Sequence, residues 1–79
     1  RDKTLNVIKN ITVEQELDGM MEFADIGTLN ERMSDRRILK REFEGKINGL
    51  CRAIFVEVDR NIDGTLHHVL FLVECIAEN

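Results

Sequence analysis

Two adjacent histidines, His67 and His68, have the most obvious capacity for chemistry in this sequence. An imidazole exchanges a proton near neutral pH and is a common metal ligand. Neighbouring residues on a regular β-strand point to opposite faces, so the pair is not expected to chelate one metal ion. The sequence therefore predicts a structural or surface role and no metal site, with pH sensing and metal binding as the alternatives.

The two cysteines, Cys51 and Cys75, lie in segments that we expect to be strands. A zinc site needs further ligands at close spacing, and the sequence contains no C-x-x-C motif. Two cysteines make no disulfide framework, and disulfides are rare in the cytosol. No export signal is visible, so we expect a cytoplasmic protein with two reduced thiols that behave as small hydrophobic residues.

Charged side chains are abundant but form no catalytic constellation. Carboxylates recur between residues 14 and 25, and basic residues crowd the segment between residues 32 and 41. General acid–base catalysis needs a carboxylate in a pocket with a shifted pKa, whereas these charges are typical of a solvated surface. No glycine-rich phosphate loop or serine nucleophile motif occurs. We therefore expect no enzymatic activity, and the sequence indicates no particular cofactor.

The composition is that of one small globular domain. The chain has 79 residues, of which 43% are hydrophobic and 33% charged, and its formal net charge is −4. A negative net charge argues against nucleic-acid binding, which needs a basic surface. The longest apolar run has five residues, far too short to span a membrane. The first residue is Arg1 rather than Met, which favours a piece of a longer chain.

Helical spacing dominates residues 1–34. Apolar residues recur at helical intervals in 1–12, which favours a helix, with a short strand through Leu5 and Val7 as the alternative. They recur at helical intervals again from Val13 to Ala24. Thr12 with Gln15, and Thr28 with Glu31, fit the capping-box pattern that opens a helix. Gly19 lies inside the second segment, where it costs about 1 kcal/mol relative to alanine. We therefore expect the second helix to be bent or interrupted there.

From residue 38 the period changes to that of strands. Three strands are predicted, at about 38–47, 50–59 and 65–76. Asn48-Gly49 and Asp63-Gly64 are typical of tight hairpin turns. Strands joined by such short turns form an antiparallel meander in chain order. The sequence thus predicts an α+β fold in one domain, residues 1–79, with helices in 1–34 packed on a three-stranded sheet in 38–76.

The predicted sheet is apolar on both faces. One face should pack against the helices, but the other also carries apolar side chains: Ile54, Val56, Val58, Leu70 and Leu72. An exposed apolar patch of this kind usually marks an interface. We expect a second copy of the chain to cover it, giving a homodimer, or a helix supplied by the full-length protein.

Two stretches resemble PAS-like sensor domains of bacterial signalling proteins, such as those ahead of diguanylate cyclase or histidine kinase domains. "FADIGTLNERM" (residues 23–33) resembles the helical segment before the sheet of that family. "REFEGKINGLCRAIFVEVDRNIDGTLHHVLFLVECI" (residues 41–76) resembles its long C-terminal hairpin. The resemblance covers about two thirds of the chain, with its best anchors at Arg52-Ala53, Phe55, Asp63-Gly64 and Val69-Leu70.

The resemblance implies a truncated PAS-like module that senses a signal and dimerises, and an output domain beyond Asn79. It also implies a pocket for a small-molecule ligand, for which the candidate residues are Phe43, Cys51, Phe55 and Phe71. Two positions depart from the pattern, because Leu50 stands where the family has Trp and Cys75 where it has Asp. The Asp couples the sheet to an output helix in that family, and this chain lacks that carboxylate.

The sequence therefore favours a non-catalytic regulatory module of a bacterial signal-transduction protein. One alternative is a structural or phage-type interaction protein that binds no ligand. Another is a small α+β ligand-binding protein or enzyme whose site forms between subunits. In that case the histidines and cysteines would have to converge across the dimer.

Overall fold

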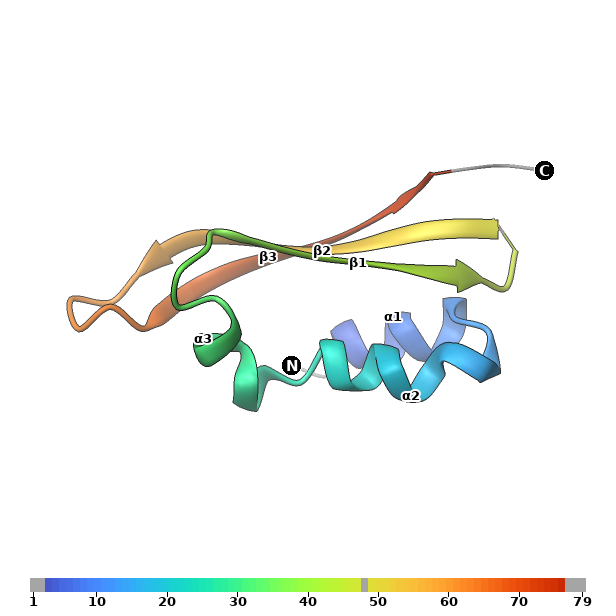
Figure 1. The fold of residues 1–79 in the computed structure, drawn as a ribbon, viewed down its shortest axis with the longest axis horizontal. Coiled ribbons are helices and arrows are strands. Elements are labelled where there is room, and N and C mark those ends of the chain that lie inside the picture. The colour runs from blue at the N-terminus through green and yellow to red at the C-terminus, as the bar shows by residue number, and fades with distance from the viewer. Residues whose placement is uncertain (1–2, 48, 77–79) are drawn as a thin grey trace.

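The protein has a helical layer on one face of a three-stranded sheet. The structure is a computed structural model that describes residues 3–47 and 49–76. The elements in chain order are α1 (Lys3–Ile11), α2 (Glu14–Phe23), the 3-10 turn η1 (Ile26–Thr28), α3 (Leu29–Arg32), β1 (Ile38–Gly45), β2 (Gly49–Arg60) and β3 (Leu66–Cys75). All helices lie on the same side of the sheet (Figure 1). The predicted α+β class is therefore confirmed.

The sheet is the antiparallel meander that the turn signals predict. Its strand order is β1-β2-β3, with Phe43 opposite Cys51 and Phe55 opposite Phe71. Gly49 has a φ of 73°, a value that suits glycine in the tight β1–β2 turn. Asn48, the other residue of that predicted turn, lies outside the described residues.

The core forms between the helices and one face of the sheet, which we call the inner face. The sheet contributes Phe43, Cys51, Ala53 and Phe55, each no more than 4% exposed. The helical layer supplies the other buried hydrophobic residues: Ile8, Met20, Phe23, Ala24, Leu29 and Met33. The ring of Phe55 lies 5.2 Å from that of Phe23 and 5.1 Å from that of Phe71, which links α2 to β2 and β3.

Two expectations about the ends of the helices are wrong. The N-cap of α2 is Val13 rather than Thr12, and no side chain caps it. The Thr12 hydroxyl faces inward, where its oxygen is buried and finds no hydrogen-bond partner among the residues that the structure describes. Thr28 does precede α3, but its hydroxyl donates to Asp25 O and makes no cap hydrogen bond. Thr12 is thus drawn into the core, whereas the Thr28 hydroxyl bonds to local partners in place of the helix cap.

The predicted break at Gly19 is also absent, because α2 continues through it from Glu14 to Phe23. A Cβ at this position would lie 2.6 Å from Nη2 of Arg41. The glycine therefore leaves room for the Arg41 side chain of β1 to lie against α2.

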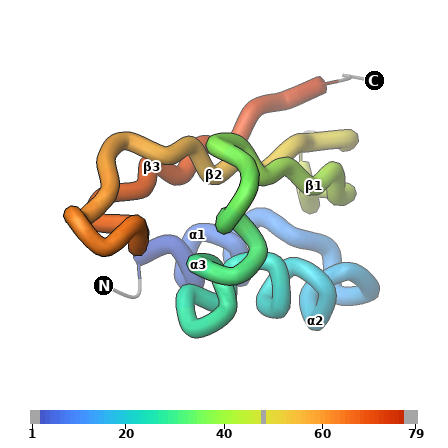
Figure 2. Tube along the Cα trace, turned by 60° about the vertical axis from the view of Figure 1, so that its left-hand side comes forward, coloured from blue at the N-terminus to red at the C-terminus, as the bar shows by residue number. Residues whose placement is uncertain are grey.

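The turn between α1 and α2 is hydrogen-bonded to the free edge of β1, the edge that does not pair with β2. Val13 N donates to Glu44 O over 3.1 Å, and Lys46 N donates to Ile11 O over 2.7 Å. The Glu16 carboxylate accepts a further bond from Glu44 N at 3.0 Å. These bonds satisfy backbone groups that an edge strand otherwise leaves to solvent, and they place the helices under β1 and β2 (Figure 2).

Candidate functional site

The face of the sheet opposite the helices, which we call the outer face, carries a continuous apolar stripe. The strand register aligns Ile38 with Val56 and Leu70 in one row. In the next row Ile54 lies beside Leu72, with Lys40 of β1 on its other side. Ile38 and Leu70 are each 49% exposed and Leu72 is 43% exposed, whereas Ile54 and Val56 are half-buried among their neighbours. These five residues form the outer stripe.

Charged residues bound the outer stripe at one end. Arg52 of β2 lies between Glu42 of β1 and Glu74 of β3 in the next row of the register. Its guanidinium contacts Glu74 at 2.8 Å and Glu42 at 3.4 Å. The row carries two carboxylates and one cation, so this end of the stripe is net negative.

Four of the five predicted interface residues belong to the outer stripe: Ile54, Val56, Leu70 and Leu72. The fifth, Val58, is 61% exposed and lies where the β2–β3 register shifts between Glu57 and Asp59. Ile38 is a member that the sequence analysis left out, and the observed β1–β2 register places it opposite Val56. The predicted interface remains a hypothesis, and its residues are accessible.

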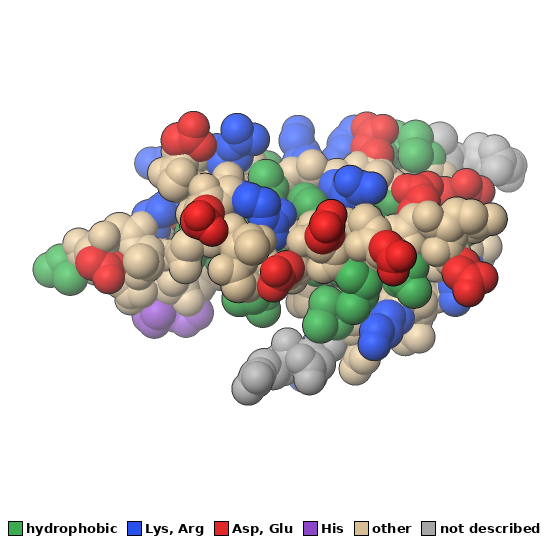
Figure 3. Space-filling view, turned by 60° about the horizontal axis from the view of Figure 1, so that its bottom comes forward, with side chains coloured by type: hydrophobic (Ala, Val, Ile, Leu, Met, Phe, Trp, Pro, Cys, Tyr) green, Lys and Arg blue, Asp and Glu red, His purple; other side chains and the backbone are tan. Residues whose placement is uncertain are grey.

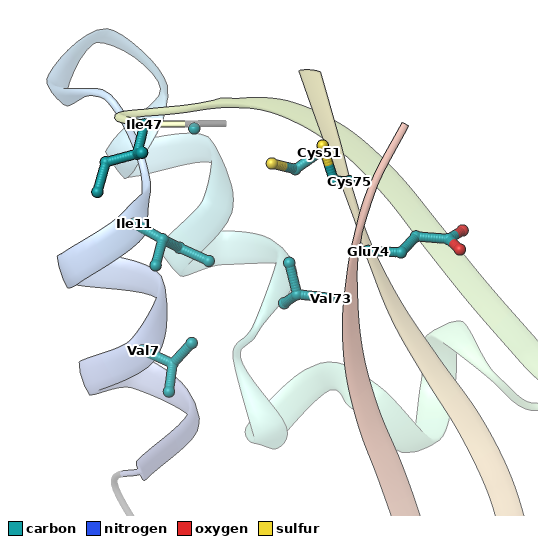
Figure 4. Close-up of a pocket in the computed structure, with 8 residues that line it drawn as sticks. Val7, Ile11, Ile47, Cys51, Val73, Glu74 and Cys75 are labelled. Atoms are coloured by element: carbon teal, nitrogen blue, oxygen red, sulfur yellow. The ribbon is translucent and has the colours of Figure 1, made fainter. Parts of the chain in front are cut away.

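Two apolar grooves lie between α1 and β3 on the inner side. The first, about 270 Å³, is lined by Val7 and Ile11 of α1 and by Val73, Cys51 and Cys75 of the sheet. Val7 and Ile11 point across it toward Val73, and the Glu74 carboxylate points away (Figure 4). The second, about 280 Å³, lies nearer the β2–β3 turn, where its lining includes Thr4, Asn30, Phe55, His67 and Phe71.

The four predicted pocket residues do not share a cavity. Cys51 lines the first groove, and Phe55 and Phe71 line the second. Phe43 lines neither of these grooves and is only 1% exposed within the core. The sequence identified the inner face correctly, but the register separates these side chains along the sheet.

The two cysteines are directly opposite each other in the sheet, which the sequence analysis did not anticipate. Cys51 pairs with Cys75 in the β2–β3 register, and both are thiols. Cys51 is buried and Cys75 is exposed. Burial, together with the neighbouring thiol of Cys75, raises the pKa of Cys51 despite a hydrogen bond that lowers it. If residues are paired outward from the Asp63-Gly64 turn, the predicted partner of Cys51 differs from the observed one, Cys75, by one position.

His67 and His68 do not point to opposite faces, so that expectation is wrong. Their ring centroids lie 4.0 Å apart, and both rings approach the carboxylate of Asp59 on β2. Partial desolvation raises the pKa of Asp59, but the hydrogen bond and charge from His68 and the charge from His67 together hold it below its usual value. Register shifts at Asp59 interrupt the regular alternation. Counting outward from the Asp63-Gly64 turn would have placed Asp59 opposite His68.

The histidines and cysteines lie at opposite ends of β3, so they form no common site within one chain. The scattered charges fit the predicted solvated surface, with acidic and basic side chains interspersed over the helical face (Figure 3). Arg32 is an exception, because it donates to Phe23 O at 2.8 Å and Asp25 O at 3.0 Å and so supports the α2–α3 connection.

None of the helices within residues 3–47 and 49–76 is long and apolar enough to cross a membrane. Comparisons of the chain with protein-family models, curated proteins and solved structures find no match. The resemblance to PAS-like sensor domains therefore stays a hypothesis.

Proposed function

We propose that this chain is a non-catalytic regulatory module of a cytoplasmic bacterial signalling protein, a truncated PAS-like domain that pairs with a second copy of itself through the outer stripe. The observation that carries the proposal is that helices cover only one face of the sheet. All helices lie on the inner face, while Ile38, Leu70 and Leu72 remain accessible on the outer face. Removing such a contiguous apolar surface from water favours association.

Charge along β1 favours a second copy as the occupant. Basic residues, Arg36, Arg37 and Lys40, lie at or near the start of the strand, and Glu42 and Glu44 lie toward its end. A two-fold axis lying between two such outer faces and perpendicular to the strands would stack the two sheets with their strands antiparallel. The acidic end of each sheet would then lie over the basic end of the other, which is the self-complementarity that a two-fold dimer requires.

The size of the outer face sets the expected strength of the dimer. Strands about 4.8 Å apart with a rise of about 3.4 Å per residue give this three-stranded face a projected area of about 500 Å². Stable specific interfaces bury about 800 Å² per partner. The isolated module should therefore form a weak, reversible dimer, as suits a module whose association is regulated.

β3 offers a physical route from ligand to partner. Its inward side chains Phe71 and Val73 line the two grooves, and its outward side chains Leu70 and Leu72 belong to the outer stripe. A small apolar ligand in a groove and a second copy on the outer face would thus contact the same strand from opposite sides. A shift of β3 would change both contacts and pass toward an output domain beyond Asn79.

Sedimentation equilibrium across a range of protein concentrations tests the pairing. The wild type should show a reversible monomer–dimer equilibrium, and Leu70→Lys should raise its Kd by about tenfold or more, because each dimer would bury two new charges. Ile62→Lys is the matched control, since Ile62 is fully exposed in the β2–β3 turn, away from the stripe. A wild type that is monomeric at millimolar concentration, or equal effects of the two substitutions, would overturn the proposal.

A further inference from the structure

The β2–β3 ladder contains two adjacent irregularities near its turn. The register steps from Glu57 opposite Val69 to Asp59 opposite His68, and then to Arg60 opposite Leu66. One extra residue therefore lies on β2 and one on β3. β-Bulges of this kind re-aim side chains and occur next to functional sites.

The irregular ladder gathers three metal-ligating side chains at the surface. Asp59 Oδ1 lies 3.0 Å from His68 Nδ1 and 3.5 Å from His67 Nδ1. One ligand atom from each of the three residues lies within 4.8 Å of the other two. All three side chains are about half exposed, and Figure 3 shows the histidines together on the surface. An ion can therefore reach the cluster directly from solvent.

The two oxygen–nitrogen distances are close to the ligand separations around a small metal ion. In a tetrahedral site with bonds of about 2.0–2.1 Å, the ligand atoms lie about 3.3 Å from one another. The two oxygen–nitrogen distances bracket that value, so small side-chain rotations would close the site. Three protein ligands leave one position for water or an exogenous ligand.

Neighbouring charges leave the cluster accessible to a cation. Arg60 is the nearest basic residue in β2, and its guanidinium is held elsewhere by three contacts. Its Nε donates to Glu57 at 2.8 Å, its Nη1 to Gly64 O at 2.7 Å and its Nη2 to Met33 O at 2.7 Å. The carboxylate of Asp59 is thus left to the two imidazoles.

We propose that Asp59, His67 and His68 form a binding site for a divalent transition-metal ion of the Zn²⁺, Ni²⁺ or Cu²⁺ class. Two imidazoles and one carboxylate suit these ions, whereas Mg²⁺ and Ca²⁺ prefer sites made of oxygen ligands. The site is independent of the proposed dimer, because it lies beside the β2–β3 turn and beyond the outer stripe. His67 also lines the second groove, so a bound ion would stand at the rim of that groove.

Isothermal titration calorimetry of the full chain with ZnCl₂ tests the site. The wild type should bind one Zn²⁺ per chain, and MgCl₂ should give no saturable heat. His67→Ala, His68→Ala and Asp59→Asn should each weaken Zn²⁺ binding by at least about tenfold. Loss of a residue that only orients a metal ligand already weakens binding by about that factor, and loss of the ligand itself should cost at least as much. Asp63→Asn is the matched control, since it removes a carboxylate from the same hairpin but outside the cluster, and it should retain wild-type affinity.

Two further measurements make the result decisive. Circular dichroism should show that all variants keep the wild-type fold, as expected for exposed side chains. Absorption of the Co²⁺ complex should lack thiolate charge-transfer bands, and Cys75→Ser should leave the Zn²⁺ affinity unchanged. The proposal is overturned if the wild type shows no saturable Zn²⁺ binding, if any one of the three ligand variants keeps wild-type affinity, or if Asp63→Asn or Cys75→Ser weakens binding as much as they do.

Discussion

The two edge strands of the sheet, β1 and β3, differ in how closely the rest of the chain contacts them. The β1 edge is attached to the α1–α2 turn through the backbone bonds of Val13, Glu44 and Lys46. Along β3, by contrast, Leu70, Leu72 and Val73 are each between 37% and 49% exposed, and grooves separate this strand from α1. Backbone hydrogen bonds therefore hold the β1 edge to the helical layer, whereas both faces of β3 remain accessible.

This asymmetry locates the proposed functions on the less covered strand. A strand with few buried contacts opens and shifts at lower free-energy cost than one embedded in a core. The outer stripe, both grooves and the histidine cluster all include residues of β3. β1 contributes mainly to stability, and β3 is the strand on which ligands and partners can act.

The largest expected effect comes from truncating one phenylalanine on each edge strand. Phe43→Ala on β1 should cost about 3–5 kcal/mol, because the ring is only 1% exposed and leaves a cavity. Phe71→Ala on β3 should cost about half as much, because this side chain is only partly buried. Urea unfolding of both variants, at protein concentrations where they are monomeric, gives the comparison.

Equal losses for Phe43→Ala and Phe71→Ala would contradict the asymmetry between the two edges. A 79-residue domain has a total stability of about 4–12 kcal/mol. If the total lies at the lower end of this range, Phe43→Ala should be close to unfolding at room temperature, whereas Phe71→Ala should keep a clear folded baseline.

The sequence predicted the sheet well because its signals are local. Alternation and turn glycines gave the three strands, their order and the inner residues Cys51, Ala53 and Phe55. The outer positions of Ile54, Val56, Leu70 and Leu72 followed from the same alternation. Because a hairpin turn fixes register, the pairing of Cys51 with Cys75 was within reach of the same reasoning.

What the sequence missed depends on irregularities in the β2–β3 ladder and on contacts between distant segments. The β2–β3 bulges turn His67 and His68 to one carboxylate, and no alternation pattern encodes such a step. Thr12 fits a capping box, yet the attachment of the α1–α2 turn to β1 draws its hydroxyl inward. The grooves arise because α1 covers β3 incompletely, which is decided by how the helices pack rather than by any local motif.

A smaller effect is expected from Thr12, which lies where the helices meet β1. Its buried hydroxyl oxygen has no hydrogen-bond partner within the described part of the chain, so Thr12→Val should stabilise the protein by about 1 kcal/mol. Thr28→Val is the matched control and should destabilise by about 0.5–1.5 kcal/mol, because its hydroxyl donates to Asp25 O and accepts from Arg32 Nε. Loss of stability in Thr12→Val would show that this hydroxyl is satisfied after all, and urea unfolding measures both changes.

The cysteines provide a chemical comparison between β2 and β3. Cys75 should react with iodoacetamide several-fold faster than Cys51, because Cys51 is buried and its raised pKa lowers the fraction of reactive thiolate. Mass spectrometry of the partly labelled protein measures the two rates, and Cys75→Ser isolates the slow one. Faster labelling of Cys51 would mean that the end of β3 leaves the sheet readily.

The smallest effect concerns the β2–β3 turn, which extends past the helices in Figure 1. The Asp63 carboxylate accepts bonds from Thr65 Oγ1 at 2.7 Å and Thr65 N at 3.0 Å, and these hydrogen bonds lower the pKa of Asp63. A lowered pKa in the folded state gives stability that is present above the ordinary carboxyl pKa of about 3.9 and is lost as the pH falls through the folded value.

The wild type should therefore have a higher Tm than Asp63→Asn at pH 7. The gap should narrow as the pH falls below about 4 and close once the pH lies below the lowered folded-state pKa, where the carboxyl is protonated in both states. Thermal unfolding followed by circular dichroism between pH 7 and pH 3 measures the gap. The effect should be small, because the carboxylate is fully exposed and water competes for its hydrogen bonds. A gap that stays constant across this range would show that the turn is held by its backbone alone. In that case β3 would depend even less on side-chain contacts than its exposure indicates.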